Sequence, residues 1–235
     1  MAVFVVAHGA WSSAWAWKKM RPLLRAGGHE IWTPTYTGLG ERAHLASPAV
    51  DLDTHIKDVI GVLEMEDLTD VVLIGHSYGG MVATGVADRA RDRIAQVVYL
   101  DAFVPKDGQS VFDLQDAAAR DHMRELARTS GDGWRLPANP MPPDTAPEDV
   151  AWASGRRLPQ PLKTFEQALQ LSAKTPPPRS YIYCRRNRPG DVFRQFLERA
   201  QKESGWRHFE MDASHNPHIT VPEELMAILQ KIVSS

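Results

Sequence analysis

The chain has 235 residues, enough for one sizeable domain, and its 43% hydrophobic and 24% charged residues are typical of a globular protein. Its 27 Lys and Arg residues nearly balance its 29 Asp and Glu residues, which argues against a nucleic-acid surface, because such surfaces carry a basic excess. The single cysteine, Cys184, excludes an internal disulfide and a cysteine-rich metal cage.

Short apolar runs rich in β-branched residues predict strands that are buried on both faces of a parallel sheet. In chain order these six strands are Val3–Ala7, Glu30–Thr35, Val71–Ile74, Val97–Leu100, Tyr181–Cys184 and Arg207–Met211. Helical spacing of apolar residues lies between most of them, over Thr54–Met65, Gly79–Ala90, Val192–Lys202 and Glu223–Val233. This alternation predicts an α/β fold, with a mostly parallel sheet of about six strands flanked by helices on both faces.

The alternation breaks once, between Pro105 and Arg179. We expect one or two helices over Val111–Arg128, irregular proline-dense chain over Leu136–Pro147, and another helix over Thr164–Ala173. Insertions of this length at the end of a strand are usually functional. We therefore predict a core made of residues 1–105 and 179–235, and a helical cap over residues 106–178, inserted after the strand that ends near Asp101.

The stretch Gly75-His76-Ser77-Tyr78-Gly79 follows a predicted strand and precedes a helix of small residues. The pattern G-x-S-x-G in this context is the nucleophile elbow, in which a tight turn projects the serine hydroxyl away from the backbone. A glycine-rich turn that happens to hold a serine is the alternative. The strand–turn–helix context favours Ser77 as a nucleophile.

The stretch His8-Gly9-Ala10-Trp11 follows the first strand. A loop at this place supplies one backbone N–H to an oxyanion hole, and the residue after the nucleophile supplies the other. We therefore assign the amides of Ala10 and Tyr78 to this role. His8 is interpreted as a structural histidine that braces the loop.

The general base is expected in the loop after the last strand, which reads Asp212-Ala213-Ser214-His215. His215 is the candidate, and His218, three residues later, could line the substrate pocket. A His-x-x-His metal pair is the rival interpretation, but no third ligand with zinc spacing accompanies it. We expect no metal. Gly38-Leu39-Gly40 lacks the third glycine of a dinucleotide loop, so no nucleotide cofactor is expected either.

The acid partner of the base has several candidates. Asp101 stands at the tip of the strand after the nucleophile strand, where a buried carboxylate needs a partner such as a histidine. It could instead be structural and accept hydrogen bonds from loop amides. After the Tyr181–Cys184 strand, Asn187 occupies the usual carboxylate position and Asp191 comes later. We favour Asp101, with Asp191 and Asn187 as alternatives.

The chain resembles an α/β-hydrolase, and more narrowly the branch that holds plant methylesterases, hydroxynitrile lyases and related bacterial carboxylesterases. The resemblance covers nearly the whole chain outside the cap. Its most specific parts are residues 8–15 (HGAWSSAW), 75–80 (GHSYGG) and 214–218 (SHNPH). It implies Ser77 as nucleophile, His215 as base and an oxyanion hole at Ala10 and Tyr78.

Two departures from this family pattern bear on function. The usual acid position falls on Asn187, although some related hydrolases, including certain haloalkane dehalogenases, carry their acid at the strand tip where Asp101 stands. The lyases of the branch carry threonine where this chain has Gly9, and lysine where it has Asn216. The absence of that lysine, which stabilises the leaving cyanide, favours an esterase.

The sequence thus predicts a cofactor-free serine carboxylesterase that forms an acyl-enzyme on Ser77. Hydroxynitrile lyase-type C–C cleavage at the same site, or a hydrolase-fold ligand-binding protein with slow turnover, are the alternatives. The expected partner is a small-molecule ester, with no nucleic acid and no membrane, and a homodimer is left open. No apolar run could span a bilayer and no signal peptide is evident, so we expect a cytoplasmic protein.

The cap is expected to select the substrate. Its aromatic content suggests a hydrophobic or aryl ester, since pockets are mostly apolar with a few placed polar groups. The apolar candidates are Val111, Phe112, Leu114, Trp134, Trp152, Phe165 and Leu169. Of these, Trp134 and Trp152, together with Trp11 and His218, are our pocket residues, and packing of the cap against the sheet is the alternative role.

Overall fold

Six strands pair into one parallel sheet in the computed structural model, which describes residues 1–172, 175–186 and 191–234. Their order across the sheet is β2-β1-β3-β4-β7-β8. The bounds are Val3–Ala7 (β1), Glu30–Trp32 (β2), Val71–His76 (β3), Ile94–Leu100 (β4), Arg179–Cys184 (β7) and Trp206–Met211 (β8). The predicted α/β class is confirmed, and only β2 ends earlier than expected, two residues before Pro34, which has no N–H to give to a sheet.

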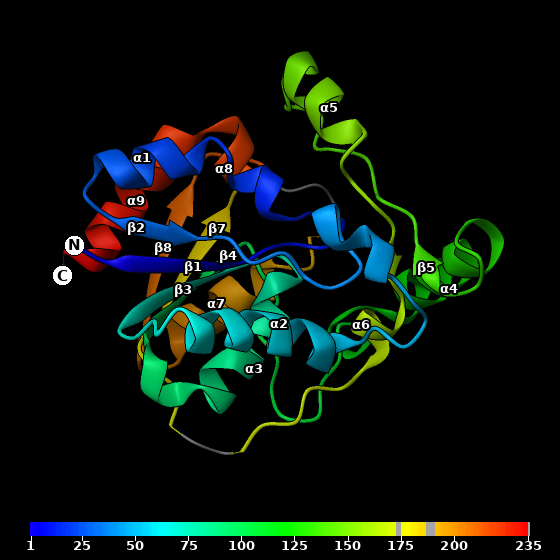
Figure 1. Ribbon diagram of the computed structural model, residues 1–235, viewed down its shortest axis with the longest axis horizontal. Coiled ribbons are helices and arrows are strands. Elements are labelled where there is room, and N and C mark those ends of the chain that lie inside the picture. Colours follow the sequence, from blue (N-terminus) through cyan, green and yellow to red (C-terminus); the bar gives the residue numbers. More distant parts are fainter. Residues whose placement is uncertain (173–174, 187–190, 235) are drawn as a thin grey trace.

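Helices cover both faces of the sheet (Figure 1). One face carries α1 (Met20–Ala26), α8 (Pro217–Thr220) and α9 (Pro222–Val233); the other carries α2 (Leu52–Met65), α3 (Gly79–Arg89) and α7 (Arg194–Lys202). Successive β1 residues point to opposite faces, so Phe4 packs with the first group and Val5 with the second. Burial on both sides explains the continuous apolar run of this strand.

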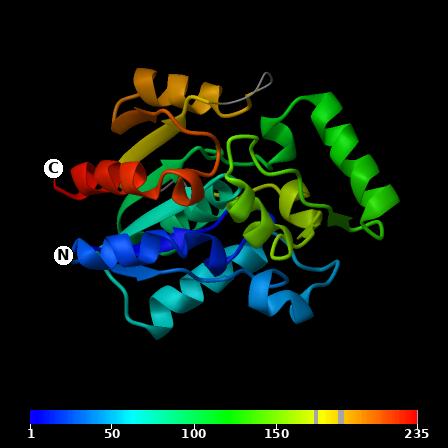
Figure 2. The same ribbon diagram turned by 90° about the horizontal axis from the view of Figure 1, so that it is seen from above.

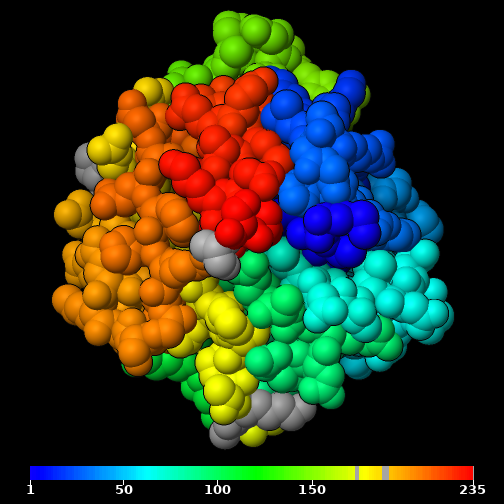
Figure 3. Space-filling model, turned by 90° about the vertical axis from the view of Figure 1, so that its left-hand side faces the viewer, coloured from blue at the N-terminus to red at the C-terminus, as the bar shows by residue number. Residues whose placement is uncertain are grey.

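Local signals in the sequence set several helix ends. Asp51 caps α2 by accepting from the Thr54 N–H (3.0 Å) in a capping box. Pro222 stands at the first turn of α9, where a missing N–H costs nothing. Helix α9 packs against α1, and Figure 3 shows the red C-terminal residues beside the blue N-terminal ones. None of the described helices is long and apolar enough to cross a membrane.

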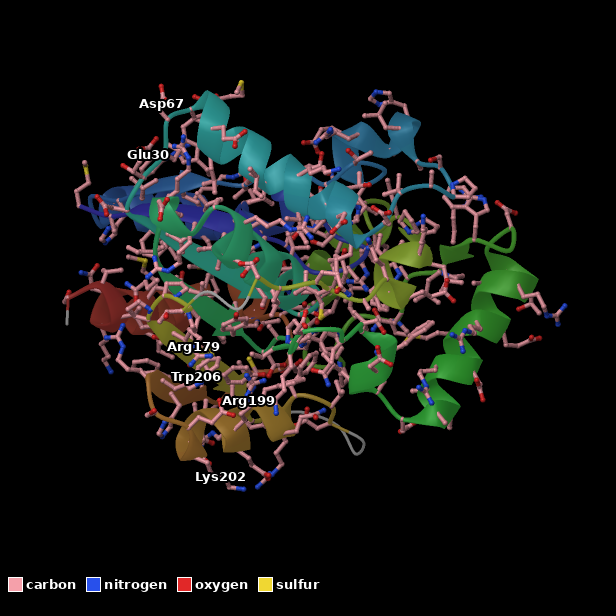
Figure 4. All side chains as sticks on the ribbon, turned by 90° about the horizontal axis from the view of Figure 1, so that it is seen from below. Glu30, Asp67, Arg179, Arg199, Lys202 and Trp206 are labelled. Atoms are coloured by element: carbon pink, nitrogen blue, oxygen red, sulfur yellow. The ribbon has the colours of Figure 1, made fainter. Side chains whose placement is uncertain are left out.

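The sheet edge at β7 and β8 carries an aromatic–cation contact. Arg179 and Trp206 are register partners at the start of these strands, and the guanidinium carbon lies 4.3 Å from the indole centroid. Figure 4 shows both side chains near Arg199 of α7. The contact lies at the amino-terminal ends of β7 and β8, on the sheet face that carries α7. Ser77 lies at the opposite, carboxyl-terminal end of the strands.

Most of the segment that joins β4 to β7, which we call the connecting segment (residues 101–178), lies beyond the carboxyl ends of the strands (Figures 1 and 2). Its last residues return along α3, where Ser172 donates to Asp88, and reach β4, where the Pro178 carbonyl accepts from the Val97 N–H. It contains α4 (Ala117–Ser130), α5 (Pro147–Ser154), α6 (Lys163–Glu166) and a separate antiparallel pair, β5 (Arg135–Leu136) with β6 (Gln160–Pro161). The segment also contains a short 3₁₀ turn, η4 (Phe112–Leu114). Three others lie outside it: η1 (Ala14–Trp17), η2 (Gly40–Leu45) and η3 (Arg91–Arg93).

The helix predicted over Thr164–Ala173 is wrong over residues 167–172, and Ala173 lies outside the described residues. Gln167 adopts an extended conformation, and its side-chain oxygen accepts from the Asp53 N–H (3.0 Å), which ties the chain to α2. A tertiary hydrogen bond therefore outweighs local helical spacing here.

Four histidines are buried around the carboxyl ends of β1 and β3: His8, His55, His76 and His218, each at most 3% exposed. Burial disfavours the charged imidazolium and lowers the pKa of His8 and of His218 to about 3, and that of His55 to about 4. Burial and the neighbouring His218 and His215 hold the pKa of His76 well below its ordinary value. All four side chains are therefore neutral in the folded protein near pH 7.

These histidines predict a loss of stability in mild acid. The unfolded chain binds their protons near pH 6.5 whereas the folded protein does not, so the stabilisation is complete above pH 6.5 and is lost as the pH falls toward 4. Each histidine contributes up to about 1.4 kcal/mol per pH unit in that window. Urea unfolding at pH 7, 6 and 5 measures the slope.

The matched variant is His55→Gln. Glutamine can donate to the Thr37 carbonyl and accept from the Tyr78 hydroxyl, as His55 does, without binding a proton. We expect the unfolding free energy of the variant to change less steeply with pH than that of the wild type. The difference in slope should correspond to about one proton fewer taken up on unfolding. Equal slopes in the two proteins would contradict this account.

Candidate active site

Ser77 stands on the turn between β3 and α3 with a φ of 55°, a left-handed conformation that non-glycine residues adopt rarely. The neighbouring glycines make the turn sterically feasible. A Cβ at Gly79 would overlap the Ala7 carbonyl, one at Gly80 would overlap the Phe103 carbonyl, and one at Gly75 would lie 2.8 Å from the Ala83 Cβ. Strand and helix therefore approach closely, and the serine side chain faces a pocket.

His215 lies in the loop after β8 and connects two other side chains. Its Nε2 lies 2.9 Å from the Ser77 Oγ, and its Nδ1 lies 2.7 Å from the Asp101 Oδ2. A carboxylate only accepts, so Nδ1 carries the proton and donates to Asp101, while Nε2 accepts from the serine hydroxyl. The structure thus brings Ser77, His215 and Asp101 into one hydrogen-bonded chain.

Asp101 follows β4, which lies between β3 and β7 in the sheet. Its side chain is fully buried, its φ is 42°, and its Oδ1 accepts from the Cys184 N–H of β7 (3.1 Å). One oxygen is therefore fixed by the sheet and the other faces His215. A buried carboxylate needs such partners to remain ionised.

The two alternative acid positions differ from Asp101. Asp191 accepts from the Tyr183 hydroxyl (2.5 Å) and from the Phe193 N–H (2.8 Å), at the start of α7. Both of its oxygens are therefore engaged away from His215. Asn187 lies outside the described residues.

Ala10 and Tyr78 line the same pocket as Ser77. Within the described part of the chain, neither of their amides donates a hydrogen bond to a protein acceptor. Tyr78 is the residue after the serine, and its N–H lies at the N-terminus of α3, where the helix dipole favours negative charge. Two unpaired amides in one pocket with a serine hydroxyl can donate to a negatively charged oxygen that develops there.

His8 and His55 support these two residues from the core side. His8 donates from Nδ1 to the Gly9 carbonyl (2.8 Å), accepts from the Tyr36 N–H at Nε2 (3.2 Å) and stacks on the Tyr36 ring. His55 accepts from the Tyr78 hydroxyl (2.9 Å). His8 therefore braces the loop, as the sequence indicates, and is not in the chain of Ser77.

The pocket in front of Ser77 has a volume of about 360 Å³. Trp11 and His218 line it, as do Phe165 and Met123 of the connecting segment. Trp134 and Trp152 are not among the described residues that line it.

Those two tryptophans have other contacts. The Trp134 ring lies beneath the Arg135 guanidinium, and Trp152 packs edge-on against Trp15 with ring centroids 5.0 Å apart. The second contact ties α5 to η1.

Two residues of the site were missed by sequence reasoning. Phe193 stacks on the His215 ring with centroids 4.9 Å apart and planes at 10°. His76 donates from Nε2 to the His215 carbonyl (2.8 Å). The position of His76 directly before the serine was a usable signal, whereas nothing in the pattern around Phe193 distinguishes it from a core residue of α7.

The metal pair that the sequence offers lies within the described ranges. They contain no group of three or more His, Cys, Asp or Glu side chains placed to hold a metal ion. His215 and His218, the metal pair weighed from the sequence, have separate contacts: His215 binds Ser77 and Asp101, and His218 stacks on Trp17 with centroids 4.8 Å apart.

Comparison with known proteins finds relatives that align along almost the whole chain. The chain is 39% identical to a carbendazim hydrolyzing esterase of Nocardioides sp. (strain SG-4G), over 96% of this chain and 97% of that protein. It is 27% identical to the pFDCC methylesterase MES16 of Arabidopsis thaliana, over 98% and 94% of the two chains.

Among solved structures, an extracellular alpha/beta-hydrolase from a Paenibacillus species superposes with a TM-score of 0.87 at 26% identity, covering 98% of both chains. That hydrolase is described as sharing structural and functional homology with tobacco salicylic acid binding protein 2. The profile of the alpha/beta hydrolase family matches residues 3–228. With the serine turn, the histidine loop and the parallel sheet described above, these matches show that the chain belongs to the alpha/beta hydrolase family.

Proposed function

We propose that this protein is a serine carboxylesterase that hydrolyses small, hydrophobic or aryl carboxylic esters through an acyl-enzyme on Ser77. The observation that carries the proposal is the hydrogen-bonded chain Ser77–His215–Asp101, which faces a pocket beside two free amides. The esterase and methylesterase relatives support the same reaction class.

In the first half-reaction, the Ser77 Oγ attacks the ester carbonyl carbon while the His215 Nε2 takes the hydroxyl proton. The negative charge that develops on the carbonyl oxygen binds the N–H groups of Ala10 and Tyr78. Collapse of this intermediate breaks the C–O bond of the leaving alcohol, to which His215 returns the proton.

In the second half-reaction, His215 takes a proton from water and the resulting hydroxide attacks the acyl carbon. The bond between that carbon and the Ser77 Oγ then breaks, His215 returns the proton to the Oγ, and the carboxylic acid leaves. His215 is positively charged in both transition states. The carboxylate of Asp101 fixes its tautomer and stabilises that charge.

The pocket supports a small, largely apolar substrate. Its volume of about 360 Å³ lies near the lower end of the 300–1,000 Å³ that is usual for ligand pockets. Aromatic side chains of Trp11, Phe165 and Phe193 form part of its wall. A flat acyl or leaving group would pack against these rings.

We also propose that residues 106–178 act as a cap over a core of residues 1–105 and 179–235. Lining residues from η4–α4, the 139–143 stretch and α6 support this division. The proposed reaction needs no cofactor. A cytoplasmic location and a homodimer stay predictions.

Replacing the nucleophile tests the reaction. Ser77→Ala removes the attacking oxygen, so hydrolysis of p-nitrophenyl acetate, butyrate and benzoate should fall to the uncatalysed rate, and a fluorophosphonate probe should no longer label the protein. Full activity of the variant would refute the proposal. If the wild type is labelled by the probe but hydrolyses none of the esters, a binding protein is indicated. If the wild type releases cyanide from mandelonitrile and Ser77→Ala does not, a lyase is indicated.

The acid is tested by neutralising it. Asp101→Asn retains the shape but removes the charge that stabilises the His215 imidazolium, so kcat should fall by about 10⁴-fold while the fold is kept. Asp191→Asn is the matched control and should cost far less, because Asp191 binds Tyr183 and Phe193 instead of His215. A larger loss of kcat in Asp191→Asn than in Asp101→Asn would instead assign the acid to Asp191, in the loop after β7.

The selecting role of the proposed cap is tested on α4. Met123 lines the pocket, whereas Leu126, one turn further along, packs against the core without lining it. Met123→Ala should enlarge the pocket and shift the ranking of kcat/KM toward longer acyl chains. Leu126→Ala should leave the ranking unchanged. Identical rankings for all three proteins would count against a selecting role for this helix.

A further inference from the structure

Trp11 has a strained backbone next to the Ala10 amide. Its φ is 57°, and a bulky residue in this left-handed region costs about 1–3 kcal/mol. Such a conformation persists only where surrounding contacts hold it.

The β5–β6 pair of the connecting segment supplies them. The Trp11 backbone N–H donates to the Gln160 Oε1 (3.3 Å), and its indole N–H donates to the Leu136 carbonyl (2.9 Å). Leu136 and Gln160 are directly paired across β5 and β6. One cross-strand pair thus holds both polar groups of the same tryptophan.

Gln160 is itself fixed in place. Its side chain is fully buried, and its Nε2 donates to the Thr164 Oγ1 (2.8 Å), which in turn donates to the Pro161 carbonyl (2.7 Å). Thr164 therefore holds the nitrogen end of the amide, which orients the Oε1 toward Trp11. A buried network in which every member is paired holds a single geometry.

The Ala10 amide is bracketed by two such contacts. The Gly9 carbonyl belongs to the same peptide group as the Ala10 N–H, and His8 donates to it (2.8 Å). The Trp11 N–H belongs to the next peptide group and is held by Gln160. Gln160 therefore occupies the Trp11 N–H, whereas the adjacent Ala10 N–H donates to no protein acceptor among the described residues.

We infer that Gln160 is a positioning residue, which sets the direction of the Ala10 N–H through Trp11 and so makes oxyanion stabilisation depend on docking of the β5–β6 pair. This inference rests on the proposed esterase function. Gln160 does not touch the substrate in this account. It acts on the transition state, because the charge that the Ala10 N–H stabilises develops only there.

The test compares Gln160→Met with the wild type. Methionine has a similar length but cannot accept from the Trp11 N–H strongly. We expect kcat to fall by about 10- to 100-fold with little change in KM, which is less than the 10²–10³-fold loss for deleting an oxyanion donor. The second-order rate of fluorophosphonate labelling should fall in parallel, because the phosphoryl oxygen occupies the same hole. Gln160→Glu, which retains an acceptor oxygen, should recover most of kcat.

The matched control is Asp149→Asn. It breaks the ion pair between Asp149 of α5 and Lys19 (2.7 Å), another tie between the connecting segment and the core, without touching Trp11. It should lower Tm but leave kcat within about twofold. If Gln160→Met does not fold, Trp11→Phe is the second variant. It removes the bond to Leu136 and, because Trp11 lines the pocket, some substrate contact as well. The inference then requires kcat and the labelling rate to fall together, beyond any change in KM.

The outcomes separate this inference from the proposed function. Unchanged kcat in Gln160→Met, a change confined to KM, or an equal kcat loss in Asp149→Asn would overturn the inference and leave the esterase proposal standing. A wild type that hydrolyses no ester overturns the esterase proposal, and the ratio of labelling rates between wild type and variant still measures the Gln160 effect. A wild type that neither hydrolyses nor labels overturns both.

Discussion

Two backbone hydrogen bonds between the ends of β3 and β4 hold the parts of the site together. The Ser77 N–H donates to the Leu100 carbonyl, and the Phe103 N–H donates to the Ser77 carbonyl, each over 3.2 Å. They extend the parallel ladder beyond its last regular pair and force the serine turn to lie beside Asp101. His215 then needs only to reach across β7 from the neighbouring β8 to contact both side chains.

Backbone strain is concentrated at the carboxyl ends of the strands, next to the pocket. Among the described residues, six other than glycine have a positive φ, and three of them are Trp11, Ser77 and Asp101. Each follows one of the adjacent strands β1, β3 and β4. Left-handed backbone costs free energy that packing elsewhere must offset, and here it turns each residue out of the sheet direction. The sheet supplies the rigidity that such turns require.

The sequence was sufficient to predict the six strands, the turn that holds Ser77 after β3, and the contact between Asp101 and His215. These features have local signals: apolar β-branched runs, the glycines around Ser77, and a carboxylate directly after a strand. The catalytic roles of these residues stay predictions.

The connecting segment was far less predictable. The β5–β6 pair consists of two residues in each strand and has no periodicity to detect, and α6 ends where Gln167 binds α2. Trp134 and Trp152 stood out by composition, but their rings pack against Arg135 and Trp15 instead of lining the pocket. Pocket membership depends on tertiary packing that no short window of sequence records.

The anchoring of Asp101 within the sheet has a consequence for how such an enzyme can diversify. One of its oxygens accepts from the Cys184 N–H of β7, and its own N–H donates to the Ile182 carbonyl of the same strand. Under the proposed mechanism, the charge that supports His215 thus belongs to the strand framework instead of a surface loop. The loop after β7 and the parts of the connecting segment outside Asp101 and the β5–β6 pair are then free to exchange residues and lengths, so that new substrates can be accommodated while the groups that transfer the proton are retained.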